Sequence, residues 1–207
     1  MGEAGFLCTV CCRWFGRLMP QGFSLGDETQ SLEIVESETV YRGAIWDVRR
    51  ETFDYRGEKL TRDFVDHPGA VSIVALNDNA EIMMIRQYRH AIRALDWEIP
   101  AGLLDIPGED PLVCAQRELV EEADLEADTW QHLTRLNTTP GGSNESTHIF
   151  LATGLHEREH DYVRTGEEAD LEKRWVPLSD VVAEILSGEM TNQISVTAVL
   201  AVYASRH

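Results

Sequence analysis

The spacing of apolar residues changes character several times along the chain. Between residues 32 and 67, apolar and polar residues alternate and β-branched and aromatic types are frequent, which predicts short antiparallel strands with a turn at Tyr55–Gly57. Residues 70–76, AVSIVAL, form an almost unbroken apolar run, as in a strand that is buried on both faces. The turn NDNA and a second strand, EIMMIRQYRH, come next, so we expect these two strands to pair as a hairpin.

Helical spacing replaces this pattern after residue 110. Pro111 suits the first turn of a helix, and the side chain of Asp110 is placed to cap that turn. A single apolar stripe then repeats at intervals of three and four residues, formed by Leu112, Ala115, Leu119 and Ala123. The spacing predicts a helix over residues 111–123.

The rest of the chain predicts more strands and two more helices. TWQHLTRLN and HIFLATGL are expected strands around the loop TTPGGSNES, and KRWVPL is a further strand. LSDVVAEILSGEM predicts a helix that is capped by Ser179 and ends at Gly188. Residues 192–207 predict a closing helix.

The charge balance narrows the classes of partner. The 207 residues include 36 acidic and 18 basic ones, which gives a formal net charge of −18. Proteins that bind nucleic acid or anionic membranes usually present clustered Lys and Arg, and the sequence has no such cluster, so neither partner is expected. No segment approaches the ~20 apolar residues of a membrane span. An acidic surface instead favours divalent cations.

Cysteine usage indicates a reducing environment. Cys8, Cys11 and Cys12 lie in one cluster, CTVCC, but no second pair of ligands follows at the spacing of a closed zinc site. Cys114 lies inside the predicted helix, where a packing role is expected. The sequence therefore favours a reduced, cytoplasmic protein.

The first 27 residues differ in composition from the rest of the chain. Arg13 and Arg17 interrupt their short apolar run, unlike the pattern of a signal peptide. We expect residues 1–27 to be a disordered or optional extension.

Three glutamates crowd the segment QRELVEEADL inside the predicted helix: Glu118, Glu121 and Glu122. At about 100° per residue they fall within an arc of roughly 100°, beside the apolar stripe. Like charges at this spacing destabilise an isolated helix. Either this is a solvated acidic face, or a hard divalent ion compensates the charge; Mg²⁺ suits the second interpretation because it takes oxygen ligands.

The residues around these glutamates resemble the box of the Nudix hydrolases, GX5EX7REUXEEXGU, in which U is aliphatic. Gly102, Glu109 and the run Arg117–Leu125 match it, with two departures. Six residues rather than five separate Gly102 from Glu109, in a loop where insertions are tolerated. Asp124 replaces the glycine that ends the box helix in a left-handed conformation, which Asp tolerates better than most residues. We expect a modest cost in stability and intact chemistry.

The resemblance implies roles for individual residues. The positions that match the family's metal ligands are Ala101, through its backbone carbonyl, Glu118, Glu121 and Glu122. Arg117 would orient this cluster and Glu109 would assist it. In the family, the late acidic loop, here GEEAD, often supplies a general base. We select Glu168 for that role, and Glu167 and Asp170 remain alternatives.

Beyond the box, residues 30–205 resemble the ADP-ribose pyrophosphatase branch of the family, including its actinobacterial type. RQYRH, WEIPAGLLD, PGGSNES and EEADLE are similar to segments of that branch. Pro140 stands fifteen positions after the box, which marks specificity for ADP-ribose in the family. The matching substrate-binding residues are Trp46, Arg50, Arg89, Glu98 and Glu145. Each of these also fits an ordinary packing or surface role, so the assignments are hypotheses.

The resemblance also predicts the architecture and the reaction. It implies an α/β fold, the Nudix α/β/α sandwich with a mixed sheet over residues 70–207, preceded by a small antiparallel β segment over residues 28–69. In the resembled branch that segment exchanges between two subunits, which implies a homodimer. The implied activity is Mg²⁺-dependent hydrolysis of ADP-ribose to AMP and ribose 5-phosphate, with Mn²⁺ as a substitute ion. Two alternatives stay open: hydrolysis of another nucleoside diphosphate sugar, such as a GDP-sugar, and a catalytically silent Nudix-like ligand-binding module.

Overall fold

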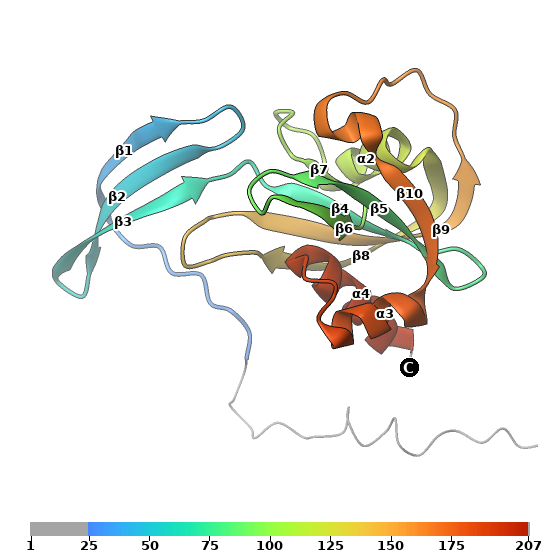
Figure 1. Ribbon diagram of the computed structural model, residues 1–207. Helices are drawn as coiled ribbons and strands as arrows, with labels where there is room; N and C mark the ends of the chain where they lie inside the picture. The colour runs from blue at the N-terminus through green and yellow to red at the C-terminus, as the bar shows by residue number, and fades with distance from the viewer. Residues whose placement is uncertain (1–24, 207) are drawn as a thin grey trace, which may run out of the picture.

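Three sheets and three α-helices build the part of the chain that the computed structural model describes, residues 25–206 (Figure 1). The predicted extension, residues 1–27, lies almost wholly outside the described residues. Within residues 25–206, no helix has both the length and the apolar character needed to cross a membrane.

The first sheet consists of three antiparallel strands in the order β1–β2–β3: β1 (Ile34–Arg42), β2 (Asp47–Tyr55) and β3 (Glu58–Asp66). Arg56 and Gly57 both have positive φ, 57° and 86°, as in the tight turns that match strand twist. The carboxylate of Asp54 accepts the Gly57 N–H at 2.9 Å, which fixes this turn. The strands and the turn predicted from the sequence are confirmed. Figure 1 shows that this sheet projects away from the rest of the protein.

Two further sheets form the body. The four-stranded sheet has the order β7–β4–β9–β8, with β7 (Ala101–Leu103), β4 (Ala70–Ala75), β9 (Ser146–Glu157) and β8 (Leu125–Asn137). It is mixed, because β4 and β9 run parallel and the other pairs antiparallel. The three-stranded sheet is antiparallel in the order β10–β5–β6, with β10 (Glu172–Pro177), β5 (Glu81–Arg89) and β6 (Ala94–Glu98).

The predicted hairpin of β4 and β5 is wrong. The two strands are joined by the expected turn, but they enter different sheets and share only an isolated bridge between Leu76 and Ile82. The edges of β4 are taken by β7 and β9, and those of β5 by β6 and β10. Neither strand has an edge left for the other. The prediction that β4 is buried on both faces is confirmed, because all six of its residues are buried.

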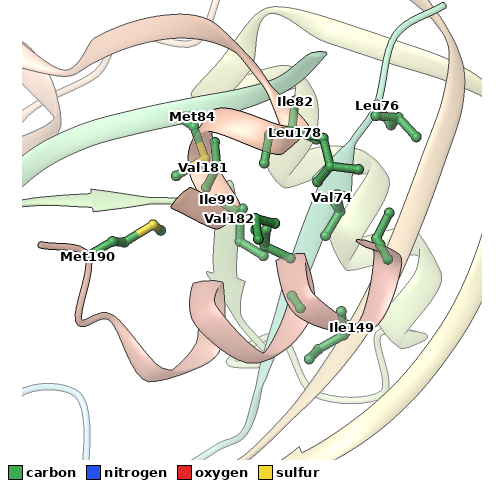
Figure 2. Close-up of a cluster of buried hydrophobic side chains, with 13 residues drawn as sticks. Val74, Leu76, Ile82, Met84, Ile99, Ile149, Leu178, Val181, Val182 and Met190 are labelled. Carbon is green, nitrogen blue, oxygen red and sulfur yellow. The ribbon is translucent and has the colours of Figure 1, made fainter. Parts of the chain in front are cut away.

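The alternating side chains of β4 serve two separate cores. Val71, Ile73 and Ala75 pack against α2 (Pro111–Ala123). Val74 joins the other core, beneath α3 (Leu178–Ser187) and α4 (Gln193–Arg206), together with the residues drawn in Figure 2. Burying each such aliphatic side chain contributes about 1.5–3 kcal/mol. Helices thus cover both sides of the sheets, and the predicted α/β/α sandwich is confirmed.

Helix α2 begins and ends as the sequence predicts. Asp110 accepts the Leu112 N–H at 2.8 Å, and Pro111 occupies the first turn. Helix α3 ends at Gly188, whose φ is 84°, also as predicted.

The predicted cap of α3 by Ser179 is wrong. The N-cap position is Pro177, which makes no side-chain cap, and the Ser179 hydroxyl instead contacts Asp180 at 3.2 Å. The helix follows β10 directly, and the Leu178 N–H donates to the Ala80 carbonyl at 2.9 Å. A backbone carbonyl therefore satisfies a donor at this helix end that a cap would otherwise satisfy.

Candidate active site

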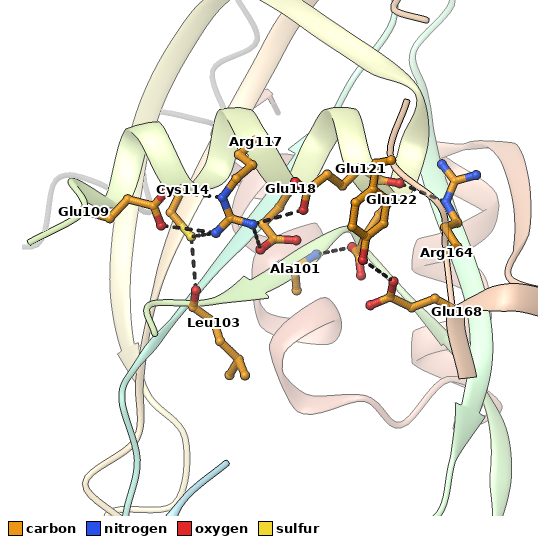
Figure 3. Close-up of polar contacts among 11 residues, drawn as sticks. Ala101, Leu103, Glu109, Cys114, Arg117, Glu118, Glu121, Glu122, Arg164 and Glu168 are labelled. Carbon is orange, nitrogen blue, oxygen red and sulfur yellow. Dashed lines mark hydrogen bonds and ion pairs between the residues drawn. The ribbon is translucent and has the colours of Figure 1, made fainter. Parts of the chain in front are cut away.

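The three glutamates of α2 lie on the side of the helix that faces Ala101 and the segment carrying Glu168 (Figure 3). Glu122 is buried, with 5% of its surface exposed, and Glu118 and Glu121 are partly buried. The predicted cluster is therefore not a solvated acidic face. Its charge must be compensated within the protein or by a cation.

Arg117 supplies part of this compensation. Its guanidinium donates to both carboxylate oxygens of Glu109, at 3.2 and 3.1 Å, to Glu118 at 2.7 Å and to Glu121 at 3.0 Å. The hydrogen bond from Arg117 lowers the pKa of Glu109, and the same contacts raise the pKa of Arg117 above its ordinary value. One cation thus ties three carboxylates together.

Burial disfavours the charged forms of Glu118 and Glu122. Burial raises the pKa of Glu118 to about 7, despite the opposing effect of Arg117. Burial also raises the pKa of Glu122 to about 8, and the neighbouring charges of Glu118 and Glu168 add to the shift. The Ala101 N–H donates to Glu122 at 2.8 Å and acts in the opposite direction. Adjacent buried carboxylates with raised pKa values are typical of a site that binds a cation.

Gly102 makes room for this cluster. A Cβ atom added at Gly102 would overlap the carboxyl carbon of Glu118. The absence of a side chain at Gly102 therefore allows the Glu118 carboxyl group to lie against β7.

The donor set suits a divalent metal ion. Glu118, Glu121 and Glu122 offer hard oxygen ligands, the kind that Mg²⁺ and Mn²⁺ prefer. Among residues 25–206, no three His, Cys, Asp or Glu side chains already stand in an ion-binding arrangement. Glu118 and Glu121 are instead bonded to the same nitrogen of Arg117. These carboxylates would exchange Arg117 for the ion.

Cys114 lies beside this cluster but has no reactive character. Burial raises the pKa of its thiol to about 12, and the thiol donates to the Leu103 carbonyl at 3.4 Å. A buried, protonated thiol fits the packing role that the sequence predicts.

Glu168 faces the α2 carboxylates from the short 3₁₀ helix η1 (Gly166–Asp170) (Figure 3). Its charge contributes to the raised pKa values of Glu118 and Glu122. The Tyr162 hydroxyl donates to Glu168 at 2.9 Å, and this bond raises the pKa of Tyr162 to about 12. Tyr162 was not predicted as a site residue, because nothing in its local sequence distinguishes it from a surface aromatic.

Asp124 ends α2 in the left-handed conformation predicted from the box, with φ 57° and ψ 37°. This conformation costs most residues about 1–2 kcal/mol and Asp less. The Asp124 carboxylate also contacts three basic side chains, Arg164 at 2.5 Å, His160 at 2.8 Å and Lys173. None of these partners was predicted. Their one signal in the sequence is the presence of basic residues within the acidic stretch HEREHDYVRTGEEADLEKR.

The structure brings two predicted substrate residues together. Arg89, at the end of β5, donates to both oxygens of Glu98 at 2.7 Å, and this pairing raises the pKa of Arg89. Glu98 is buried, whereas about half of the Arg89 side chain is exposed. The negative charge of Glu122 also raises the pKa of Arg89. The pair therefore lies near the carboxylate cluster, with Arg89 held in a fixed orientation.

Glu145 is the last residue of the loop between β8 and β9. It accepts the Thr138 hydroxyl at 2.7 Å, and its carboxylate lies 3.9 Å from His67. Glu145 and Pro140 line a hollow of about 580 Å³, which Arg62 and Phe64 line from β3.

Arg50 lies on β2 of the projecting β1–β3 sheet, and Trp46 lies in the loop just before that strand. Arg50 donates to Asp63 at 2.7 and 2.9 Å and lies 3.7 Å from Glu38, so it is engaged within its own sheet. Trp46 precedes β2 and is 42% exposed. Within one chain, β2 and the loop before it belong to the part that projects away from the layers carrying α2 (Figure 1).

Comparison with known proteins identifies this arrangement. A family model described as the NUDIX domain matches residues 66–195, and this range contains α2, its glutamates and η1. The chain belongs to the Nudix family. The predicted resemblance is confirmed, and the Nudix box coincides with β7, the following loop and α2. Nudix hydrolases generally use divalent metal ions.

Individual relatives agree with this assignment. The chain is 46% identical over 173 residues to the ADP-ribose pyrophosphatase of Mycobacterium tuberculosis, which covers 83% of each sequence. It is 34% identical over 161 residues to the ADP-ribose pyrophosphatase of Bacillus subtilis, covering 75% of this chain and 84% of that one. A crystal structure of an ADP compounds hydrolase superposes with a TM-score of 0.71 at 22% identity, covering 86% of this chain and 96% of the other. This last likeness supports the Nudix fold alone.

Proposed function

We propose that this chain hydrolyses the diphosphate of ADP-ribose to AMP and ribose 5-phosphate, with Mg²⁺ or Mn²⁺ as cofactor. The observation that carries the proposal is the buried carboxylate face of α2, opposite Glu168, in a chain 46% identical to an ADP-ribose pyrophosphatase. Buried acids with raised pKa values, beside a loop carboxylate, fit metal-assisted hydrolysis better than passive binding.

Glu118, Glu121 and Glu122, with the carbonyl of Ala101, would hold the metal. When bound, a divalent ion neutralises charge on the diphosphate oxygens and increases the acidity of a water molecule. The remaining chemistry belongs to the protein. Arg89 suits a phosphate group, because Glu98 orients its guanidinium and about half of its side chain is exposed.

Glu168 is the proposed general base. Its carboxylate accepts the proton of a water molecule that attacks one phosphorus atom in line. The bond from that phosphorus to the bridging oxygen breaks, and the bridging oxygen leaves with the other phosphate. The hydrogen bond from Tyr162 holds the carboxylate of Glu168 in place.

Product analysis tests the proposal directly. Chromatography after incubation with ADP-ribose and Mg²⁺ should resolve AMP and ribose 5-phosphate in equal amounts. Glu122→Gln should lower kcat by at least about 100-fold, since metal ions contribute several kcal/mol and each 1.36 kcal/mol is tenfold. Glu184→Gln, an exposed change on α3, is the matched control and should leave kcat unchanged.

The Glu122→Gln variant should remain folded. The amide oxygen can still accept the Ala101 N–H, and no charge is then buried. A folded variant with near-normal Mg²⁺-dependent turnover would refute the site assignment.

The two alternatives from the sequence predict different results. A preference for another nucleoside diphosphate sugar would appear in a substrate panel at equal metal concentration, as a higher kcat/KM for GDP-mannose than for ADP-ribose. A silent binding module would give calorimetric binding of ADP-ribose without release of AMP.

Assembly and location remain proposals. We propose a homodimer in which the β1–β3 sheet of one subunit brings Trp46 and Arg50 to the site of the other. In support, this sheet and its loops expose large apolar side chains, namely Ile34, Val35, Val40, Tyr41, Ile45, Trp46 and Tyr55. The cytoplasmic location expected from the cysteines stays a prediction.

A further inference from the structure

Asp124 stands where two physical rules disfavour it. A carboxylate at the C-terminal end of a helix opposes the helix dipole, and the last turn of α2 has no basic residue to offset it. The left-handed backbone at this position also favours glycine, the residue of the Nudix box. A residue that breaks local rules needs a compensating interaction elsewhere in the structure.

The compensation comes from both sides of the segment that carries Glu168. His160 and Arg164 contact the Asp124 carboxylate from before η1, and Lys173 contacts it from the start of β10, after η1. One carboxylate therefore holds the two ends of the intervening segment together. The side chains of Asp124, His160 and Arg164 are partly buried, where the ion pair of Arg164 with Asp124 is stronger than on the open surface.

Backbone contacts fasten the same segment to the end of α2. The Arg158 N–H donates to the Asp124 carbonyl at 2.9 Å. Arg164 reaches further back, because its Nε donates to the Glu121 carbonyl at 2.8 Å while its Nη2 donates to the Asp124 carboxylate. Arg164 thus links Asp124 with the backbone of Glu121, a proposed metal ligand; Figure 3 shows Arg164 beside Glu121.

A continuous chain of contacts leads from Asp124 to the proposed base. His160 Nε2 contacts the Asp124 carboxylate, and His160 Nδ1 accepts the Tyr162 N–H at 3.1 Å. The Tyr162 hydroxyl donates to Glu168 at 2.9 Å. Glu168 faces the α2 carboxylates at the end of this chain.

We propose that Asp124 is a positioning residue whose carboxylate anchors residues 158–173 and thereby holds Glu168 over the carboxylate face of α2. The proposal rests on the proposed function, because the role of Glu168 as base belongs to it. Asp124 itself touches neither substrate nor reacting atoms. A residue that only ended the helix would have no need of its carboxylate.

Replacement by glycine separates these two roles. Asp124→Gly keeps the left-handed helix end at no steric cost but removes the anchor. Amide hydrogen exchange on the full chain should then become about tenfold faster or more in residues 158–170, while the amides of α2 stay protected. Asp124→Asn, which keeps the shape and loses the charge, should act in the same direction.

Kinetics give the second readout. With ADP-ribose and Mg²⁺, Asp124→Gly should lower kcat between about 10- and 100-fold and leave KM within about twofold, since the base is displaced and the substrate contacts remain. Glu168→Gln should then cost less in the Asp124→Gly background than in the wild type, because a displaced base has less to lose. Asp128→Asn, which removes a carboxylate 3.0 Å from His156 on β8 and β9, is the matched control and should change neither readout.

Two results would overturn the proposal. One is unchanged exchange of residues 158–170 in Asp124→Gly. The other is a loss from Glu168→Gln of equal size in both backgrounds. If the wild type released no AMP from ADP-ribose, the proposed function would fail, while the exchange measurement would still decide whether Asp124 anchors the segment.

Discussion

At the scale of single residues, Gly102 lies directly beneath Glu118, and its missing side chain sets the position of a proposed metal ligand. Gly102→Ala should push the Glu118 carboxylate away from Glu122. Displacing a ligand in this way typically weakens metal binding about 10–100-fold. Isothermal titration with Mg²⁺ measures the change.

Gly188→Ala is the matched control for this prediction. It costs about 1 kcal/mol at the left-handed end of α3, because alanine is strained at a φ of 84°. Mg²⁺ affinity should not change, so a loss of stability alone would be distinguished from a displaced ligand. Equal Mg²⁺ affinity in Gly102→Ala and the wild type would contradict the prediction.

The raised pKa values of Glu118 and Glu122 predict an unusual dependence on pH. Both values, about 7 and about 8, exceed the ordinary value of 4.5, so ionisation of these groups opposes folding. Their contribution to stability is fully present below pH 4.5 and is lost as the pH rises through 7 and 8. Over the same window Mg²⁺ affinity should rise, because protons and metal compete for the same oxygens.

Urea denaturation at pH 5, 7 and 9, with chelator and with Mg²⁺, checks both effects. The double variant Glu118→Gln and Glu122→Gln serves as the reference, since it lacks the two titrating groups. Without metal, the wild type should lose stability relative to this variant as the pH rises. A gain over that range would show the sign to be wrong.

At the scale of elements, α4 supports the strand segment that leads into the site. The buried Ser195 hydroxyl of α4 accepts the Ile99 N–H at 3.1 Å, just before Ala101 binds Glu122. Ser195→Ala would leave this buried donor unpaired, at a cost of about 1–3 kcal/mol. Ser179→Ala at the start of α3 should change stability by less than about 0.5 kcal/mol, because Ser179 is exposed and caps nothing. Equal losses in urea denaturation would contradict this contrast.

Element types were predictable where one local pattern decides them. The continuous apolar run identifies β4 as a buried strand, and the apolar stripe identifies the buried face of α2. Both elements were predicted correctly. The partner of β4 was not, because β9, which lies far along the chain, occupies the edge that a hairpin would use. The same limit explains the missed contacts of Asp124, whose basic partners lie 36 to 49 residues later. That the three box glutamates share one face of α2 was predictable from their spacing, whereas their role as metal ligands came from the family resemblance and stays a prediction.

At the scale of the whole molecule, the projecting β1–β3 sheet predicts the oligomeric state. Val40 and Tyr41 are neighbouring exposed apolar residues of β1, at the point where the register between β1 and β2 shifts. Val40→Asp combined with Tyr41→Asp places two charges within the exposed apolar surface that we propose a second subunit covers. The variant should be monomeric at concentrations where the wild type is a dimer, as measured by light scattering after size exclusion.

Leu186→Asp provides the control, since Leu186 is 76% exposed on α3, on the body of the protein. It should leave the mass of the particle unchanged. A wild type that is monomeric at all concentrations would refute the homodimer. It would also refute the proposal that Trp46 and Arg50 contribute to the active site of a second subunit.

The contacts of Arg117 have a consequence for the order of folding and metal binding. Its guanidinium already pairs with three carboxylates and offsets part of their charge, so the chain can fold around them before a metal ion binds. Binding of the metal ion is then an exchange, in which the ion replaces the Arg117 guanidinium as the counter-charge of these carboxylates. The apparent affinity for the ion reflects the free-energy difference between the carboxylates paired with Arg117 and the same carboxylates bound to the ion. Substitutions that weaken the pairing with Arg117 would therefore increase the affinity for the ion.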